Sequence, residues 1–254
     1  MQLDSRQDSQ MNAIPDDAAE PRGPATSRSI VRATEPQALT TRALEERRLI
    51  HRNDSARVQA DAFRDLRTRL LALRGDTNFV TLVAPVAAGC GASFVARNLA
   101  AAFAFDETKI ATLVDCDALH PAQHTALGLD AAGGGLMDYI EGTASDLQQV
   151  HYRTGLPRLY LVPGGSVREI TGESFSSLRM RTLIDSLRSS HSNRYVVLDS
   201  PPVLRSPDAR ILSELADLVV LVAGYGRVTI EQIEKAASNF DPEKLAGIVF
   251  NDLH

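Results

Sequence analysis

The sequence has no long hydrophobic run, few cysteines and no excess of basic residues. The lack of about 18 consecutive apolar residues argues against a membrane-spanning helix, and the amino terminus lacks the charged-then-apolar pattern of a secretory signal. Two cysteines, Cys90 and Cys116, are too few for a disulfide framework, so a reduced cytoplasmic protein is predicted. The formal net charge of −5 argues against a general nucleic-acid-binding protein.

The chain of 254 residues, 44% of them hydrophobic, is long enough for one sizeable domain with a tail, or for two small domains. Residues 1–41 contain four of the twelve prolines among polar residues, with few large apolar side chains. Such a segment cannot bury enough surface to offset the entropy of ordering it. It is predicted to be a disordered leader, and the alternative is a segment that docks on a partner.

An arginine-rich helical segment is predicted over residues 42–75. Phe63, Leu66 and Leu70 recur at helical spacing, and Gly75 stands where a helix C-cap is expected. Residues 42–74 carry nine arginines against five acidic residues. This charge predicts either a solvated helix face or a contact with an acidic partner or an anionic membrane surface.

From residue 76 to 254 short apolar runs alternate with helical patterns. Such alternation predicts an α/β domain with a mainly parallel sheet covered on both faces, whose functional sites lie at the carboxyl ends of the strands. The expected strands span residues 79–84, 109–114, 158–162, 195–198, 218–223 and 246–250, and the expected helices span residues 94–105, 136–141, 177–190, 208–215 and 229–239.

The first candidate loop, residues 84–93, lies between a predicted strand and a predicted helix. Small residues there let backbone N–H groups surround a phosphate, which the following helix N-terminus also favours. In the pattern of a phosphate-binding loop, Gly89, Gly91 and Ser93 stand in register, whereas Ala92 occupies the lysine position. The alternative is a glycine-rich turn that binds no ligand.

Carboxylates follow two other predicted strands. Asp115 and Asp117 end one strand and are followed by His120, and Asp199 ends another, directly before Ser200 and two prolines. Carboxylates at strand ends suit a hydrated magnesium ion or a catalytic base. Each loop taken alone is also compatible with a polar turn that caps a helix.

Together, the order and spacing of the three loops and the final stretch that ends at Asn251 resemble the bacterial tyrosine kinases of capsule and exopolysaccharide loci. These kinases belong to the P-loop group that also holds the partitioning and septum-site ATPases. The resemblance covers residues 56–254. It implies a three-layer P-loop NTPase-like α/β domain that binds ATP or ADP with Mg²⁺.

The resemblance also implies roles for particular residues. The implied catalytic residues are Asp115 and Asp117, and the implied metal-binding residues are Ser93, Asp115 and Asp199. The implied nucleotide-binding residues are Gly89, Cys90, Gly91, Ala92, Ser93, Phe94 and Asn251. The implied residues of a self-association helix are Asp61, Arg64 and Arg67.

The sequence departs from the family at the phosphate loop and at the substrate. Ala92 removes the lysine that neutralises the transferring phosphoryl group, and Arg97, one helical turn further on, is expected to point elsewhere. The family phosphorylates tyrosines on a C-terminal tail, whereas the five tyrosines here all lie within the predicted domain.

The predicted function is therefore a catalytically impaired, kinase-like regulatory or scaffold subunit of exopolysaccharide or capsule biosynthesis and export. The resemblance implies a cytoplasmic position at the inner membrane, a transmembrane polysaccharide copolymerase as partner, and a possible homo-oligomer. The alternatives are an active, ATP-dependent protein tyrosine kinase and a partitioning-type ATPase.

Overall fold

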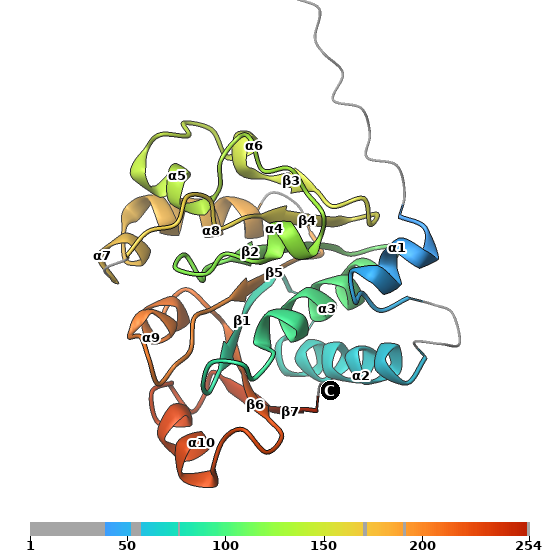
Figure 1. Ribbon diagram of the computed structural model, residues 1–254, viewed down its shortest axis with the longest axis vertical. Helices are drawn as coiled ribbons and strands as arrows, with labels where there is room; N and C mark the ends of the chain where they lie inside the picture. Colours follow the sequence, from blue (N-terminus) through green and yellow to red (C-terminus); the bar gives the residue numbers. More distant parts are fainter. Residues whose placement is uncertain (1–38, 52–56, 76, 170–171, 190–191, 253–254) are drawn as a thin grey trace, which may run out of the picture. The chain divides into compact units, whose positions relative to one another are not determined.

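A computed structural model describes residues 39–51, 57–75, 77–169, 172–189 and 192–252 (Figure 1). The described residues fall in one compact unit, Glu35–His254. Positions 1–38 of the predicted leader lie outside the described residues. Within the described ranges, no helix combines the length and the apolar composition needed to cross a membrane.

The core of the fold is a seven-stranded sheet with the order β3-β4-β2-β5-β1-β6-β7. Neighbouring strands run parallel, except for the antiparallel pair β3 and β4. This sheet confirms the mainly parallel α/β fold. The strands are β1 (Phe79–Pro85), β2 (Ile110–Asp115), β3 (Tyr152–Arg153), β4 (Leu159–Val162), β5 (Arg194–Asp199), β6 (Leu218–Gly224) and β7 (Leu245–Asn251).

Helices cover both faces of the sheet. In Figure 1, α2 and α3 lie on one side of the central strands, and α8 and α9 lie on the other. The helices are α1 (Thr41–Glu46), α2 (Arg57–Arg74), α3 (Ala92–Ala104), α4 (Gln123–Ala126), α5 (Leu136–Glu141), α6 (Leu147–Val150), α7 (Gly172–Phe175), α8 (Leu178–Ser189), α9 (Asp208–Ser213) and α10 (Ile230–Ala237).

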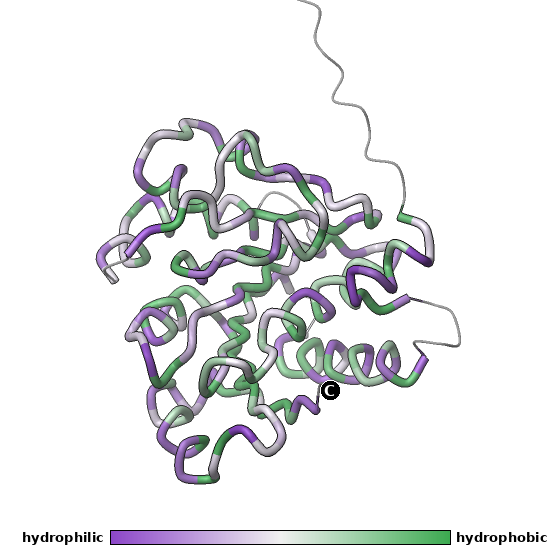
Figure 2. The backbone as a smooth tube through the Cα atoms, in the orientation of Figure 1, coloured by the Kyte–Doolittle hydropathy of each residue, from purple (hydrophilic) through white to green (hydrophobic). Residues whose placement is uncertain are grey.

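The central strands are mostly hydrophobic, as the green stretches in the middle of Figure 2 show. Every residue of β1 and β6 is buried, which explains why these strands read as continuous apolar runs rather than alternating patterns. Phe103 of α3 stacks on Tyr195 of β5 with ring centroids 4.5 Å apart, and Phe79 of β1 meets Tyr195 edge-on at 5.0 Å. These rings fix α3, and therefore the loop before it, against the sheet.

The predicted helical segment over residues 42–75 contains two helices instead of one continuous pattern. The first helix ends at Glu46, and Arg48 then takes a left-handed conformation with φ of 51°. Asn98 of α3 explains the break, because its buried amide accepts a hydrogen bond from Ile50 N at 2.7 Å and donates one to the Arg48 carbonyl at 3.0 Å. A long-range side-chain contact therefore overrides local helical propensity here.

The end of α2 follows the sequence-based expectation. Gly75 has a φ of 69°, and its N–H donates to the Leu71 carbonyl at 2.7 Å. Glycine adopts this left-handed conformation without steric cost, so Gly75 is the predicted C-cap.

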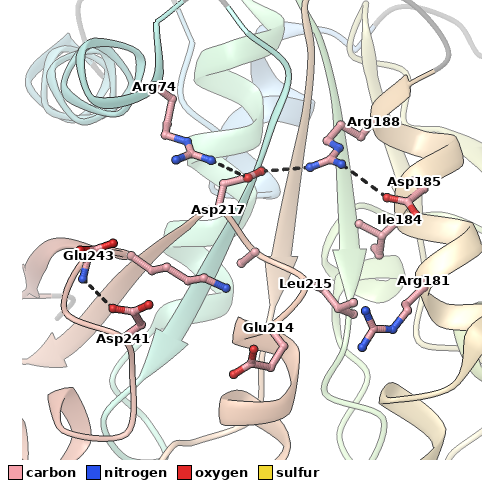
Figure 3. A pocket seen from close by; sticks show the side chains of 12 residues that line it. Arg74, Arg181, Ile184, Asp185, Arg188, Glu214, Leu215, Asp217, Asp241 and Glu243 are labelled. Atoms are coloured by element: carbon pink, nitrogen blue, oxygen red, sulfur yellow. Dashed lines mark hydrogen bonds and ion pairs between the residues drawn. The ribbon is translucent and has the colours of Figure 1, made fainter.

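A polar cavity of about 420 Å³ lies at the amino ends of the strands, and we call it the amino-end cavity (Figure 3). Asp217, which directly precedes β6, accepts from Arg74 at 2.6 Å and from Val80 N at 2.9 Å, and Arg188 lies 3.5 Å away. Arg188 is also 3.5 Å from Asp185. Arg74 and Arg188 are thus paired with carboxylates of the same domain.

Candidate functional site

Three loops meet at the carboxyl ends of β1, β2 and β5 because these strands are adjacent in the sheet. Asp115 at the end of β2 stands directly opposite Asp199 at the end of β5 in the parallel register. The loop after β1, residues 84–93, lies beside them and is called the phosphate loop below. Together the three loops line a cavity of about 360 Å³, the carboxyl-end cavity.

The phosphate loop keeps a backbone shape that suits an anion. Gly89 and Gly91 have φ of 78° and 80°, in the left-handed region, and Gly91 is the N-cap of α3. These conformations place the start of a 13-residue helix, whose first N–H groups have no partner within the helix, at the cavity. Ala92 is the first residue of that helix and only 3% exposed, and it carries no charge.

The acids Asp115 and Asp199 are both buried. Asp115 accepts N–H bonds from Ala122 at 2.9 Å and from Gln123 at 3.0 Å, and Asp199 accepts from the Gln123 amide at 2.7 Å. Burial holds the pKa of both carboxyls above their usual range, and the neighbouring Asp199 raises the pKa of Asp115 further. Paired buried acids of this kind favour the arrival of a positive charge.

A magnesium ion fits this pair. The Oδ1 atom of Asp199 is buried and has no hydrogen-bond partner among the described residues. A hydrogen bond from the Ser93 side chain is one of the contacts that lower the pKa of Asp199, so the hydroxyl and the carboxylate are neighbours. Mg²⁺ prefers such oxygen ligands and completes its shell with water and phosphate oxygens. Among the described residues, no group of three or more His, Cys, Asp or Glu side chains could hold a metal ion without such additional ligands.

Asp117 and His120 form the rim of the carboxyl-end cavity. Asp117 is half-buried, and its carboxylate accepts the His120 N–H at 3.1 Å. The imidazole of His120 is exposed and lies 3.7 Å from the same carboxylate. Asp117 is thus the acidic side chain of this loop that borders the cavity, as a base or a water ligand must.

Gln123 and Arg97 connect the acids to α3, and the sequence motifs do not indicate this role for Gln123. The Gln123 amide donates to Asp199 and to the Ser93 carbonyl at 2.9 Å, and its oxygen accepts from Arg97 at 3.1 Å. Arg97 is buried beneath the loop and does not line the cavity. Burial lowers the pKa of Arg97, and the charge of Asp199 partly offsets this.

The remaining nucleotide-binding candidates divide into two groups. Asn251, at the end of β7, donates to the Cys90 carbonyl at 3.0 Å and so lies beside the phosphate loop. Phe94 faces away from the cavity and meets Phe63 of α2 edge-on at 5.9 Å. Cys90 and Cys116 are buried free thiols.

The candidate assembly residues on α2 make contacts within the chain. Asp61 and Arg64 form an exposed ion pair at 3.0 Å. Arg67 turns toward α3 and donates to the Ala102 carbonyl at 2.9 Å. Asp61 and Arg64 are therefore exposed on the outer side of α2, whereas Arg67 holds α2 on α3.

Known proteins share this chain's sequence pattern and fold. EpsB of Ralstonia solanacearum is 34% identical over 197 residues, which cover 76% of this chain and 26% of that protein. Tyrosine-protein kinase wzc of Salmonella typhimurium is 30% identical over 198 residues, which cover 76% of this chain and 27% of that protein. The chain thus spans about a quarter of the length of these curated relatives. No protein-family model matches it.

Among solved structures, the kinase domain of Escherichia coli tyrosine kinase ETK matches with a TM-score of 0.73 at 23% identity, over 89% of this chain and 85% of that chain. The sheet order and the loop at the end of β1 define the class: a P-loop NTPase-like α/β domain. Within this class, the chain is similar in sequence to bacterial tyrosine-protein kinases.

Proposed function

We propose that the chain binds a magnesium nucleotide weakly at the carboxyl-end cavity and acts as a catalytically impaired, kinase-like subunit in exopolysaccharide or capsule biosynthesis and export. The observation that carries the proposal is the phosphate loop. Its glycines and the helix after it retain the shape of an anion cradle, while Ala92 stands at the position of the lysine.

The loss of the lysine affects transfer more than binding. Negative charge spreads over the phosphoryl group in the transition state, and a cation fixed in the loop stabilises it there. Removing one preorganised charged donor costs about 3–4 kcal/mol, or a rate factor of about 10²–10³. The backbone N–H groups that bind the ground-state phosphates remain in place. Weak binding with very slow turnover follows.

The test compares turnover and binding in the same protein. We expect phosphate release and autophosphorylation far below about 1 s⁻¹, the low end for active kinases. Calorimetry with Mg-ADP at millimolar concentration should still give a binding signal that depends on Mg²⁺. Turnover near that rate contradicts the impairment, and the absence of any heat or thermal shift contradicts the nucleotide role. Ala92→Lys should raise the affinity for ATP.

An active tyrosine kinase is the second candidate, and the acids favour it. Asp115, Asp117 and Asp199 keep the arrangement that a magnesium-dependent transfer needs, because Asp115 and Asp199 are opposite each other and Asp117 borders the cavity. A phosphotyrosine signal on the wild-type protein that disappears in Asp115→Asn would establish this candidate. A signal that persists in the variant would indicate a contaminating kinase.

The proposal includes a transmembrane copolymerase as partner, a position at the cytoplasmic face of the inner membrane, and self-association through α2. Asp61 and Arg64 are exposed there and available to another subunit. Light scattering should show an assembly larger than a monomer, in the presence of nucleotide or of the partner's cytoplasmic segment. Arg64→Ala should weaken it, with Arg69→Ala as the control. Monomers in every condition contradict a role of α2 in assembly.

A further inference from the structure

The carboxyl-end cavity contains a cation that is absent from the phosphate loop. Arg205 follows Asp199 by six positions in the loop between β5 and α9, and it lines the cavity together with residues 88–93. Of the described residues that line this cavity, Arg205 alone carries a permanent positive charge, since His120 is the other basic side chain there. The lining of the cavity thus combines the backbone of the phosphate loop with one guanidinium.

Backbone hydrogen bonds attach the segment that carries Arg205 to the phosphate loop. Val203 N donates to the Pro85 carbonyl at 2.9 Å, and Leu204 N donates to the Val86 carbonyl at 3.4 Å. Arg205 N then donates to the Pro202 carbonyl at 3.0 Å, which closes a turn. The position of the Arg205 backbone relative to the phosphate loop is therefore fixed by direct contacts between the two loops.

The Arg205 side chain is exposed and forms no hydrogen bond or ion pair among the described residues. Two other arginines near this end of the sheet are occupied, whereas a third, Arg227, has its guanidinium beside Gly89 of the phosphate loop. Arg168 forms a two-pronged contact with Glu141 at 3.0 and 3.2 Å, and Arg97 is bound to Gln123. The guanidinium of Arg205 thus has no partner among the described residues and lines the same cavity as the phosphate loop.

A second cavity indicates which part of a ligand Arg205 would meet. This outer cavity of about 340 Å³ shares Asp117, His120, Pro202 and Arg205 with the carboxyl-end cavity. Arg205 therefore lines both cavities, and the first residues of α3 line one of them. A phosphate chain that begins at the loop backbone and extends toward the outer cavity ends beside this side chain.

We propose that Arg205 takes over the charge of the absent lysine and binds the terminal phosphate of a nucleoside di- or triphosphate in the carboxyl-end cavity. The inference rests on the proposed nucleotide binding and names the residue that sustains it. The planar guanidinium suits this role because it donates two parallel hydrogen bonds to phosphate oxygens. An arginine that reaches a phosphate from another loop of the same chain is an established solution in P-loop proteins.

Calorimetry with Mg-ADP on the full chain tests the proposal. Arg205→Ala should weaken binding by about 10-fold or more, as expected for a lost hydrogen bond to a charged group. Arg205→Lys should lose less affinity, because lysine keeps the positive charge but lacks the two parallel donors of the guanidinium. Arg210→Ala is the matched control: it removes the same charge from an exposed position of α9 that does not line the cavity, and should change affinity by less than about twofold.

Moving the positive charge from position 205 to position 92 sharpens the test. Ala92→Lys should increase the affinity for Mg-ADP more in the Arg205→Ala background than in the wild type, because two cations that serve the same phosphate are not additive. Equal gains in both backgrounds would show that the two positions serve different groups and would overturn the proposal.

The possible failures can be told apart. If the wild type binds Mg-ADP and Arg205→Ala binds it as Arg210→Ala does, the role of Arg205 is wrong and nucleotide binding stands. If the wild type binds no Mg-ADP at millimolar concentration, the proposed function fails and this inference with it. Equal thermal unfolding midpoints of wild type and variants show that any loss of affinity arises in the site. If Arg205→Ala does not fold, the affinity of Arg205→Lys decides: an affinity equal to that of Arg210→Ala would overturn the proposal.

Discussion

The two ends of the sheet differ in how their charged side chains are paired. At the amino-end cavity, Asp217 is bound to two arginines and to a backbone N–H (Figure 3). At the carboxyl-end cavity, Asp199 and Asp115 face each other without a cation between them, and Arg205 is unpaired. Charges that are satisfied internally stabilise a fold, whereas charges left unsatisfied mark a site that a ligand completes.

The same contrast explains why cavity size does not identify the functional site. The amino-end cavity, at about 420 Å³, is larger than the carboxyl-end cavity, at about 360 Å³. Part of its lining is nonetheless an ion-pair network, in which Asp217 is paired with Arg74 and Arg188. The carboxyl-end cavity has what the amino-end cavity lacks: left-handed glycines, a helix N-terminus and buried acids with raised pKa values.

The largest effect is expected from breaking the amino-end network. Asp217→Ala leaves Arg74, Arg188 and the Val80 N–H without their shared acceptor, and its side chain is 18% exposed. We expect a loss of about 3 kcal/mol in the free energy of unfolding, measured in urea. Mg-ADP affinity should not change. Asp185→Ala, at a more exposed pair, is the control and should cost less than about 1 kcal/mol; an equal loss in both would mean that Asp217 has no special role.

An acid-sensitive group outside both cavities comes next. Burial lowers the pKa of His151 to about 4, from the usual 6.5 of a histidine. Because the unfolded chain takes up the proton first, stability should be full above pH 6.5 and fall as the pH drops toward 4, by about 2 kcal/mol. Unfolding curves at pH 7 and pH 4.5 measure this fall, and His151→Gln should reduce it. An unchanged slope in the variant would assign the acid sensitivity to other groups.

The opposite sign is expected at the carboxyl-end cavity. Asp199→Asn keeps an acceptor for the Gln123 amide but removes one charge from the buried pair with Asp115. The free energy of unfolding at pH 7.5 should rise by about 1 kcal/mol, because a repulsion and a desolvated charge are both lost. The Mg²⁺ dependence of ADP binding should disappear. A decrease in stability would show that Asp199 has a structural role, as Asp217 does.

The smallest effect is expected at the exposed pair on α2. Arg64→Ala removes an ion pair between side chains that are 46% and 56% exposed, and should change the free energy of unfolding by less than about 0.5 kcal/mol. Arg67→Ala should cost more, because it removes the donor to the Ala102 carbonyl on α3. Thermal unfolding of the two variants side by side tests this order; equal costs would contradict it.

Much of the fold could be predicted from the sequence, and so could the strand-end loops that line the candidate site. Continuous apolar runs identified β1 and β6 because both are buried on both faces. The phosphate loop and the acids were found because glycine and carboxylate at strand ends carry local signals. Short elements such as β3 and α4 have two and four residues, too few to show a period.

The contacts that depend on distant residues could not be predicted. Nothing in the sequence around Gln123 indicates that its amide joins Asp199 to Arg97, since the three are brought together only by the sheet. The break after α1 has its cause in Asn98, 48 positions beyond Ile50. Arg205 looks like an ordinary loop arginine until its neighbours across the cavity are known.

The hydrogen bond between Asn251 and Cys90 joins residues that are 161 positions apart. The strand that leads into the phosphate loop, β1, also lies between β5 and β6, whose residues are made long after it. During synthesis the loop therefore emerges early, before β5, β6 and Asn251, which contact β1 and the loop, have been made. Such non-local pairing slows folding, and the phosphate loop reaches its observed geometry only once β7, which carries Asn251, has been made.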